Sequence, residues 1–408
     1  MEGIPSPTGR DPLEFHEERW KKEAENSGWL RPHTKEQRML IEADRDNADF
    51  DRRQTPEFQA WEKSLIPVVR NFKERAENPE SDRKTLLFIM GGGMKAAYAA
   101  GQVSAMNEVG ITADKVDIVV GASAGAVVAT AYAGGPEQTE RGIEMMCGPL
   151  SSKEFIDTKN PRRIYNKNVI NLALAQNLME GGQGGQYAID EEAVHRSLTE
   201  LHYVVTEPAV DSSPLRVRFL DAKKLPSMTD GITATMSLPS LTGPIPVIDE
   251  QQVLLDGALS PLPIFDIIRE FPGVTDILIL PQNPYKPNDK LEPHVLSKIF
   301  SQLLQITPLG NIAKLHQMEK YLMASKTRRE MLEFIQQITG VRIGVMWPPD
   351  DDLYTTNIDG DRAAAAVIAS KRNALRVFRA ASSNNLEGEQ KSEAASQNES
   401  FDGYQIAS

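Results

Sequence analysis

The chain has 408 residues, 40% of them hydrophobic and 25% charged, which is enough to bury a sizeable core in one large domain with extensions. The formal net charge of −12 argues against a nucleic-acid partner, because binding to phosphates requires a basic face. A single cysteine, Cys147, excludes an internal disulfide, and the N-terminus lacks the basic and then apolar pattern of a Sec signal. We expect a cytoplasmic protein; a peripheral position on membranes and export by a non-Sec route are the alternatives.

Residues 1–83 are dense in charge, and we expect them to form a helical extension laid on the main domain. An amphipathic helix is predicted at residues 56–76, because apolar side chains recur there at helical spacing: Phe58, Trp61, Leu65, Val68 and Val69. Pro67 is expected to kink or break this helix, and residues 78–83 have the composition of a linker. Docking of the extension to a membrane or to a protein partner is the alternative role.

The first strand of the main domain is predicted at residues 85–90, and it ends in three glycines, Gly91, Gly92 and Gly93. A helix follows and ends at Gly110. The N–H groups of Gly92, Gly93 and Met94 are therefore free to converge on a developing negative charge, which makes this turn a candidate oxyanion hole.

Nucleotide binding at the same turn is not expected. Ala96 replaces the third glycine of Gly-x-Gly-x-x-Gly, and no acidic residue ends the next strand, as a dinucleotide site would require. Lys95 is not a phosphate-loop lysine, because the chain has no Gly-x-x-x-x-Gly-Lys-Ser/Thr sequence.

A β-branched run at residues 116–120 leads into the pattern Gly-x-Ser-x-Gly, formed by Gly121, Ser123 and Gly125, and a helix of small residues follows. A strand, a sharp turn and a helix around this pattern are typical of a nucleophile elbow. The turn holds its central residue in a strained conformation, and its glycines permit close approach of the neighbouring strand and helix. Ser123 is thus a candidate nucleophile, and the N–H of Ala124 at the helix start would face an anion formed there.

The same residues have two structural alternatives to a nucleophile elbow. The first is an ordinary small-residue turn between a strand and a helix, which stays open on the pattern alone. The second is a membrane span over residues 118–134, which we reject because about 17 uncharged residues fall short of the roughly 20 apolar residues that a span needs.

The rest of the chain is predicted to alternate helices, strands and loops. Helices are expected at residues 138–146, 163–177, 191–201, 295–338 and 361–380, with a short helix from residue 232 that ends before Pro239. Strands are expected at residues 215–221, 276–280 and 341–345. Residues 181–185 are glycine-rich but follow no strand, which predicts a flexible loop. Residues 382–408 are rich in Ser, Asn, Gln and Glu and are expected to be disordered.

A carboxylate ends another predicted strand, at residues 252–256, where Asp256 leads into Gly257 and Ala258. An Asp-Gly pair by itself is most often an ordinary turn. Here the serine elbow, the glycine turn and the carboxylate all follow strands, and α/β sheets place their sites at the carboxyl ends of strands. We therefore expect Ser123, Asp256 and the glycine turn to meet in one cleft.

The catalytic base is expected to be Asp256, because a serine nucleophile needs a base within hydrogen-bonding reach. A carboxylate is a weak base, but burial in an apolar pocket raises the pKa of such a group toward the working range. None of the six histidines lies in a motif or at a recognisable strand end: His16, His33, His195, His202, His294 and His316. A triad completed by a distant histidine stays open as the alternative.

The three motifs together, GGGxK at residues 91–95, GxSxG at 121–125 and DGA at 256–258, resemble in chain order those of the patatin-like phospholipase family. The resemblance extends to "GGGMKAAYAAGQVSAMNEVGI", "ATMSLPSLTGPIPV", "SPLPIFDIIREFPGVTDILIL" and "PPDDDLYTTNIDGDRAAAAVIASKRNAL". It covers roughly residues 84–380 and leaves both ends outside. We accordingly expect a main domain at residues 84–381.

This resemblance implies an α/β fold, a three-layer α/β/α sandwich with a largely parallel central sheet, plus the helical N-terminal extension. It implies lipid acyl-ester hydrolysis by a Ser–Asp dyad, with Ser123 as nucleophile, Asp256 as base and the backbone of Gly91, Gly92 and Gly93 as oxyanion hole. Lys95 stands where the family has Arg or Lys. No cofactor and no metal are expected.

Three positions depart from the family pattern. Ala96 replaces a usual glycine, so helix packing there is expected to be a little tighter, and Ala258 replaces a glycine at no cost. The segment after Asp256 is one residue short, with Ser260 and Pro261 where an Asn-Pro often stands, which puts in doubt how the loop that carries Asp256 is braced.

The leading prediction is a serine lipid acyl hydrolase of the phospholipase A or lysophospholipase type. Its substrates would be phospholipids, lysophospholipids or acylglycerols at a membrane interface. Acyl transfer to an acceptor other than water is an alternative with the same chemistry. A catalytically silent lipid-binding or effector module on the same fold is the alternative from another class, and the intact motifs argue against it.

Overall fold

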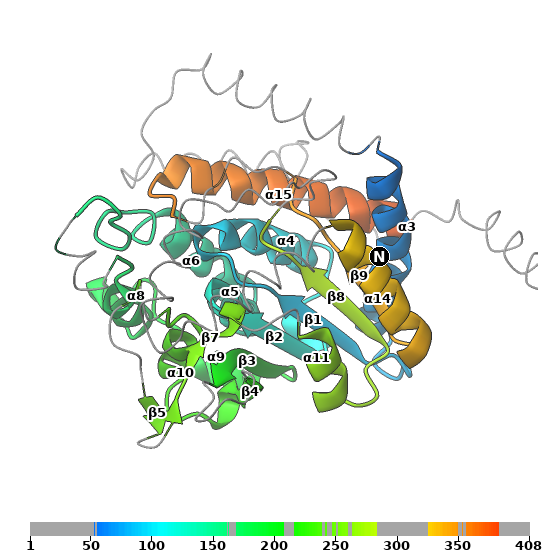
Figure 1. Cartoon of the computed structure of the whole chain (residues 1–408), viewed down its shortest axis with the longest axis horizontal. Helices are drawn as coiled ribbons and strands as arrows, with labels where there is room; N and C mark the ends of the chain where they lie inside the picture. Colours follow the sequence, from blue (N-terminus) through cyan, green and yellow to red (C-terminus); the bar gives the residue numbers. More distant parts are fainter. Residues whose placement is uncertain are drawn as a thin grey trace, which may run out of the picture.

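The fold is built on a mostly parallel sheet (Figure 1). The computed structural model describes residues 53, 55–160, 162, 169–207, 216–238, 241–242, 247–249, 252–259, 263–283, 325–349, 353 and 356–382. The strand order is β4-β3-β2-β1-β8-β9, with β7 paired to β3 as a seventh strand. The strands are β1 (Thr85–Ile89), β2 (Ile118–Ala122), β3 (Glu200–Glu207), β4 (Arg216–Asp221), β7 (Leu255–Asp256), β8 (Asp276–Leu280) and β9 (Arg342–Val345).

Parallel pairing runs from β3 through β2, β1 and β8 to β9, whereas β4 and β7 both pair antiparallel with β3. The strands β1, β2 and β8 are buried at every position, as expected for a sheet covered on both faces. A separate two-stranded ribbon joins β5 (Val247–Asp249) to β6 (Gln252–Val253).

Helices cover both faces of the sheet, because successive side chains of each strand point to opposite sides. In β1, Leu87 and Ile89 belong to the core on one face, and Leu86 and Phe88 to the core on the other. The first face carries α4 (Ala96–Glu108), α5 (Ala124–Ala133), α6 (Pro136–Cys147), α8 (Leu172–Met179), α9 (Glu191–Arg196), α10 (Met228–Thr235) and α15 (Gly360–Ser382). The second carries α11 (Ile264–Glu270) and α14 (Ser325–Thr339). The predicted α/β/α arrangement is thus confirmed.

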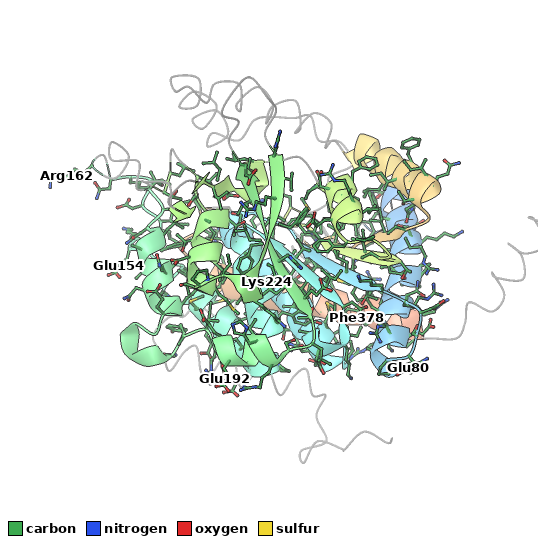
Figure 2. All side chains as sticks on the ribbon, turned by 90° about the horizontal axis from the view of Figure 1, so that it is seen from below. Glu80, Glu154, Arg162, Glu192, Lys224 and Phe378 are labelled. Atoms are coloured by element: carbon green, nitrogen blue, oxygen red, sulfur yellow. The ribbon has the colours of Figure 1, made fainter. Side chains whose placement is uncertain are left out.

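Apolar and charged side chains separate into core and surface, as this architecture requires. Phe378 of α15 is buried in the core, whereas Glu80, Glu154 and Glu192 are exposed and lie at the rim of the molecule (Figure 2). None of the helices in the described part of the chain is long and apolar enough to cross a membrane.

The N-terminal helix α3 (Pro56–Glu77) packs against the edge of the sheet, on β8 and β9, and against α15 (Figure 1). Thr55 caps it by accepting a hydrogen bond from the Phe58 N–H at 3.3 Å. The helix continues through Pro67 rather than breaking there. Pro67 is exposed, so the carbonyl that lacks its amide partner can be hydrated.

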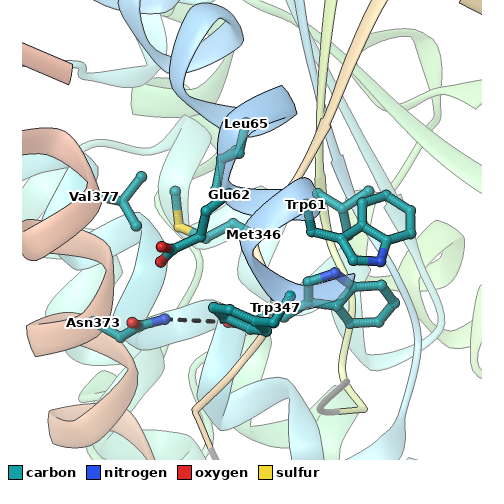
Figure 3. Close-up of a pocket in the computed structure, with 9 residues that line it drawn as sticks. Trp61, Glu62, Leu65, Met346, Trp347, Asn373 and Val377 are labelled. Atoms are coloured by element: carbon teal, nitrogen blue, oxygen red, sulfur yellow. Dashed lines mark hydrogen bonds between the residues drawn. The ribbon is translucent and has the colours of Figure 1, made fainter. Parts of the chain in front are cut away.

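A small hollow lies between α3, the end of β9 and α15 (Figure 3). Trp61 and Trp347 meet there edge to face, with ring centroids 5.5 Å apart, and Asn373 donates a hydrogen bond to the Trp347 carbonyl at 3.2 Å. Glu62 of α3 pairs with Arg376 of α15 beside them. These contacts join the N-terminal helix to the main domain. A domain boundary between residues 83 and 84 stays a prediction.

One strand, β3, was not predicted from the sequence, and the helix predicted before it runs two residues into it. The helix predicted at residues 191–201 ends at Arg196, and β3 begins at Glu200. The run from Tyr203 to Thr206 contains two valines and a threonine, whose branched side chains suit a buried strand. The error matters because β3 lies directly beside the strand that carries the serine elbow.

Other predictions fall on residues outside the described ranges. These are the greater part of the N-terminal extension, at residues 1–52, the disorder of the tail after residue 382, the greater part of the predicted helix at 295–338, the first part of the helix at 163–177, and the departure at Ser260 and Pro261.

Candidate functional site

Ser123 occupies the turn between β2 and α5. Its backbone has φ 51° and ψ −133°, and it is the only non-glycine residue with positive φ in the described part of the chain. Such a conformation is strained and persists only where the surroundings hold it. The side chain is nearly buried, with 8% of its surface exposed.

The flanking glycines of this turn permit close backbone approach. A Cβ at Gly121 would lie 2.6 Å from the Ala126 Cα. A Cβ at Gly125 would lie 2.4 Å from the Ile89 carbonyl oxygen and 2.5 Å from that of Met90. The serine turn therefore packs directly on the end of β1, where the glycine turn begins.

Asp256 lies at the end of β7, where it pairs with Val205 of β3, and is 1% exposed. Its N–H donates to the Ser237 carbonyl at 2.8 Å, and its carbonyl accepts a hydrogen bond from the Thr206 hydroxyl at 3.0 Å. The next residue, Gly257, starts the 3₁₀ turn Gly257–Leu259 and passes so close to β3 that a Cβ would lie 2.3 Å from the Val204 carbonyl oxygen. Ala258 follows in the same turn.

The Ser123 hydroxyl donates a hydrogen bond to Asp256 Oδ2 at 2.7 Å, and this contact is buried. The two residues are 133 positions apart in the chain and meet because β2 and β7 flank the same side of β3 in succession. A nucleophilic hydroxyl and a carboxylate at this separation can exchange a proton directly.

The glycine turn follows β1 and leads into α4 through the 3₁₀ turn Gly93–Lys95. Gly93 has φ 58°, a conformation that favours glycine. Amides at the start of a helix have no carbonyl partner within it, so those of Gly92, Gly93 and Met94 are suited to bind an anion, as is that of Ala124 at the start of α5. Gly91 precedes the N-cap of the turn, and its amide as an oxyanion donor stays a prediction.

Side chains that follow β8 hold this turn in place. Gln282 donates to the Met90 carbonyl at 2.7 Å and lies so close to Gly92 that a Cβ there would be 2.3 Å from the Gln282 Cβ. Lys95 is 4% exposed, and its ammonium donates to the Asn283 side-chain oxygen at 3.0 Å.

His195 and His202 are the histidines in the described ranges. His195 is exposed on α9, whereas His202 lies in β3 opposite Val120, three residues before Ser123 and thus about 10 Å away along the strand. The His202 ring packs on Phe271, with centroids 4.7 Å apart. Burial lowers the pKa of His202 below its usual 6.5, although Asp221, Glu200 and Glu270 oppose this shift.

Several residues around the serine and the aspartate were not singled out from the sequence: Thr206, Thr235, Ser237, Gln282 and Asn283. The Thr235 hydroxyl accepts a hydrogen bond from the Ser123 N–H at 2.9 Å. The sequence predicted a short helix there, and the segment also carries part of the family resemblance, but a threonine in a short helix has no local feature that predicts such a contact. No group of side chains in the described ranges is arranged to hold a metal ion.

Residues 87–267 match the family model described as Patatin-like phospholipase, and this span contains both Ser123 and Asp256. No match to a curated protein was found.

Solved structures with similarity to the chain include VipD from Legionella pneumophila, with 12% sequence identity and a TM-score of 0.38 over 74% of this chain and 67% of VipD. A second is the heterodimeric ExoU–SpcU complex from the type III secretion system of Pseudomonas aeruginosa, with 14% identity and a TM-score of 0.30 over 73% of this chain. The chain spans 51% of the matched chain in that complex, or about half its length.

Proposed function

We propose that the protein, whose residues 87–267 match the patatin-like phospholipase family model, is a serine lipid acyl hydrolase of the phospholipase A or lysophospholipase type. Its nucleophile is Ser123 and its base is Asp256. The observation that carries the proposal is the buried 2.7 Å hydrogen bond from the Ser123 hydroxyl to Asp256, made by a residue in the strained conformation of a nucleophile elbow.

In the first half of the reaction, Ser123 Oγ attacks the ester carbonyl carbon while Asp256 takes the hydroxyl proton. The carbonyl oxygen becomes an oxyanion, for which the proposed donors are the amides of the glycine turn and of Ala124. Collapse of this intermediate breaks the ester C–O bond. The proton on Asp256 passes to the departing alcohol or lysolipid, and the fatty acyl group stays on Ser123.

In the second half, water attacks the acyl-enzyme while Asp256 takes a proton from the water. Collapse of the second intermediate returns this proton to Ser123 Oγ and releases the fatty acid. Lys95 contributes a buried positive charge at the end of the glycine turn, which favours negative charge nearby. The substrate is a lipid ester at a membrane surface, and a cytoplasmic location with peripheral membrane contact is part of the proposal.

A dyad is favoured over a triad by the surroundings of His202. This residue contacts Phe271, its pKa is lowered by burial, and it lies about three strand residues below Ser123. The hydrogen bond between Ser123 and Asp256 leaves no place for an intervening imidazole.

The test is labelling of Ser123 by a fluorophosphonate, followed by hydrolysis of a panel of phospholipids, lysophospholipids and acylglycerols. Ser123→Ala should abolish both. Asp256→Asn should slow labelling by about 10²–10⁴-fold, because it removes the general base and keeps the size of the side chain. Analysis of the products separates release of free fatty acid from acyl transfer to another acceptor.

A matched control is Asp276→Asn, since Asp276 is a carboxylate of 0% exposure at the start of β8, where it bonds Asn71 and Arg342. This variant should be less stable and yet label near the wild-type rate. The proposal is wrong if wild-type protein is not labelled, or if Ser123→Ala still hydrolyses lipids. A single His→Ala variant that loses labelling as completely as Asp256→Asn would establish a triad instead.

A further inference from the structure

We propose that Thr235 is a positioning residue for the nucleophile: its hydroxyl holds the backbone of Ser123 in the conformation that presents the serine Oγ to Asp256. This role rests on the proposed function, because it concerns the same serine and aspartate. Thr235 touches neither the Ser123 Oγ nor the Asp256 carboxylate in any hydrogen bond described above, so it would act through the backbone alone.

The Thr235 hydroxyl bridges two backbone groups at the end of α10. It accepts a hydrogen bond from the Ser123 N–H at 2.9 Å and donates one to the Val204 carbonyl. A hydroxyl has one proton and two lone pairs, so it can fill both roles at once. Thr235 is completely buried, so removal of its hydroxyl would leave two buried backbone groups without this partner.

The bridge is needed because the elbow leaves the Ser123 N–H without a partner from secondary structure. Ser123 follows the last residue of β2 and precedes the first residue of α5, so neither the sheet nor the helix supplies a carbonyl for this N–H. A buried amide without an acceptor is costly, and a strained φ of 51° persists only where contacts enforce it. Thr235 supplies the missing acceptor.

The segment that contains Thr235 also holds the backbone of Asp256, the proposed base. Ser237, two residues after Thr235, accepts the hydrogen bond of the Asp256 N–H at 2.8 Å. The Val204 carbonyl that receives the Thr235 proton is also the group against which Gly257 packs. One short stretch of chain therefore fixes both backbones, and with them the 2.7 Å separation of Ser123 Oγ and Asp256 Oδ2.

The variants that test this role are Thr235→Val, which keeps the shape and deletes the hydroxyl, and Thr235→Ser, which keeps the hydroxyl. Thr130→Val is the matched control. Thr130 is equally buried, lies in α5 two turns after Ser123, and uses its hydroxyl to bond the Ala126 carbonyl at 2.8 Å and the Tyr203 hydroxyl at 2.7 Å.

The measurements are the melting temperature, the rate of fluorophosphonate labelling, and kcat and KM on a soluble short-chain ester. Thr235→Val should lower kcat and labelling by about 10–100-fold with KM little changed, because misplacement of a nucleophile by about 1 Å can cost 10²-fold. Thr235→Ser should restore both. Thr130→Val should lower the melting temperature but leave labelling near the wild-type rate.

Equal labelling of folded Thr235→Val and wild type would overturn the inference, as would an equal loss in Thr130→Val. Failure of the wild type to label would instead refute the proposed function. If Thr235→Val is recovered unfolded, Thr235→Ala takes its place in the same comparison. If that variant also fails to fold while Thr130→Val folds, Thr235 is a structural residue and the inference falls.

Discussion

Replacing Gly125 by alanine tests how closely the serine turn must approach the glycine turn. The added Cβ would lie 2.4 Å from the Ile89 carbonyl oxygen and 2.5 Å from that of Met90, whereas ordinary contacts begin at 3.4 Å. Both oxygens belong to backbone, so the start of α5 must retreat from β1 by about 1 Å, the difference between 3.4 and 2.4 Å. The retreat separates Ser123, the proposed nucleophile, from the proposed oxyanion donors that follow Met90.

We expect two consequences of this displacement. Overpacking should lower the free energy of unfolding by about 1–3 kcal/mol. A shift of about 1 Å between reacting groups should lower kcat by about 10²-fold. The assay is hydrolysis of a soluble short-chain ester, which reports kcat and KM without the complication of a lipid interface, together with a thermal melt of each variant.

Gly101→Ala is the matched control for overpacking. Gly101 lies in α4, and its Cβ would meet the Val367 carbonyl oxygen of α15 at 2.2 Å, again a backbone atom. This variant should lose comparable stability, but the displaced element is α15 rather than the serine turn, so kcat should stay near wild type. The reasoning is refuted if Gly125→Ala is folded and keeps the wild-type kcat, or if Gly101→Ala loses as much activity.

Two further predictions concern stability and pH. Burial pushes the pKa of Asp117 up, but hydrogen bonds from Arg75 and Thr85 outweigh it and hold this pKa below its usual 3.8. The resulting stabilisation is present above pH 3.8 and is lost as the pH falls through the lower pKa that Asp117 has in the folded protein. Arg75→Gln should therefore lower the free energy of unfolding by about 1–2 kcal/mol at pH 7 and by progressively less in acid. Equal costs at pH 7 and pH 3 by urea titration would contradict this. Burial lowers the pKa of His202 in the folded protein, so near pH 6.5 the unfolded chain binds a proton there more readily than the folded protein does. The stability of the fold should therefore fall as the pH drops below 6.5. His202→Gln should make stability depend less on pH in this range, and the variant should still be labelled at Ser123. If the free energy of unfolding varies with pH in the same way in the variant and the wild type, the lowered pKa of His202 is contradicted.

Local sequence patterns determined the elements that bear the chemistry. A β-branched run before Gly121 and small residues after Gly125 predict a strand, a turn and a helix from neighbours only a few residues apart. The structure has β2 and α5 at these places, with the positive φ at Ser123 that such a turn requires. The covering of the sheet on both faces was implied by the family resemblance of the motifs, not predicted from the strands themselves.

Local patterns also have a limit, which β3 illustrates. Its sequence follows a helix closely, and its central residues are buried on both faces, so no alternation of polar and apolar residues separates it from a helical continuation. Only the pairing of β3 with β2 and β4 decides that the segment is extended, because strand pairing is a contact between segments distant in sequence.

The tertiary structure alone decided which groups surround Ser123. The 2.7 Å contact with Asp256 spans 133 positions and depends on the register of β7 against β3, where a slip of one residue would turn the carboxylate to the other face. The bond from Ser123 to Thr235 spans 112 positions and depends on where α10 ends. Neither register nor the docking of a helix is encoded in the few residues around each group, because both are set by the packing of the whole core.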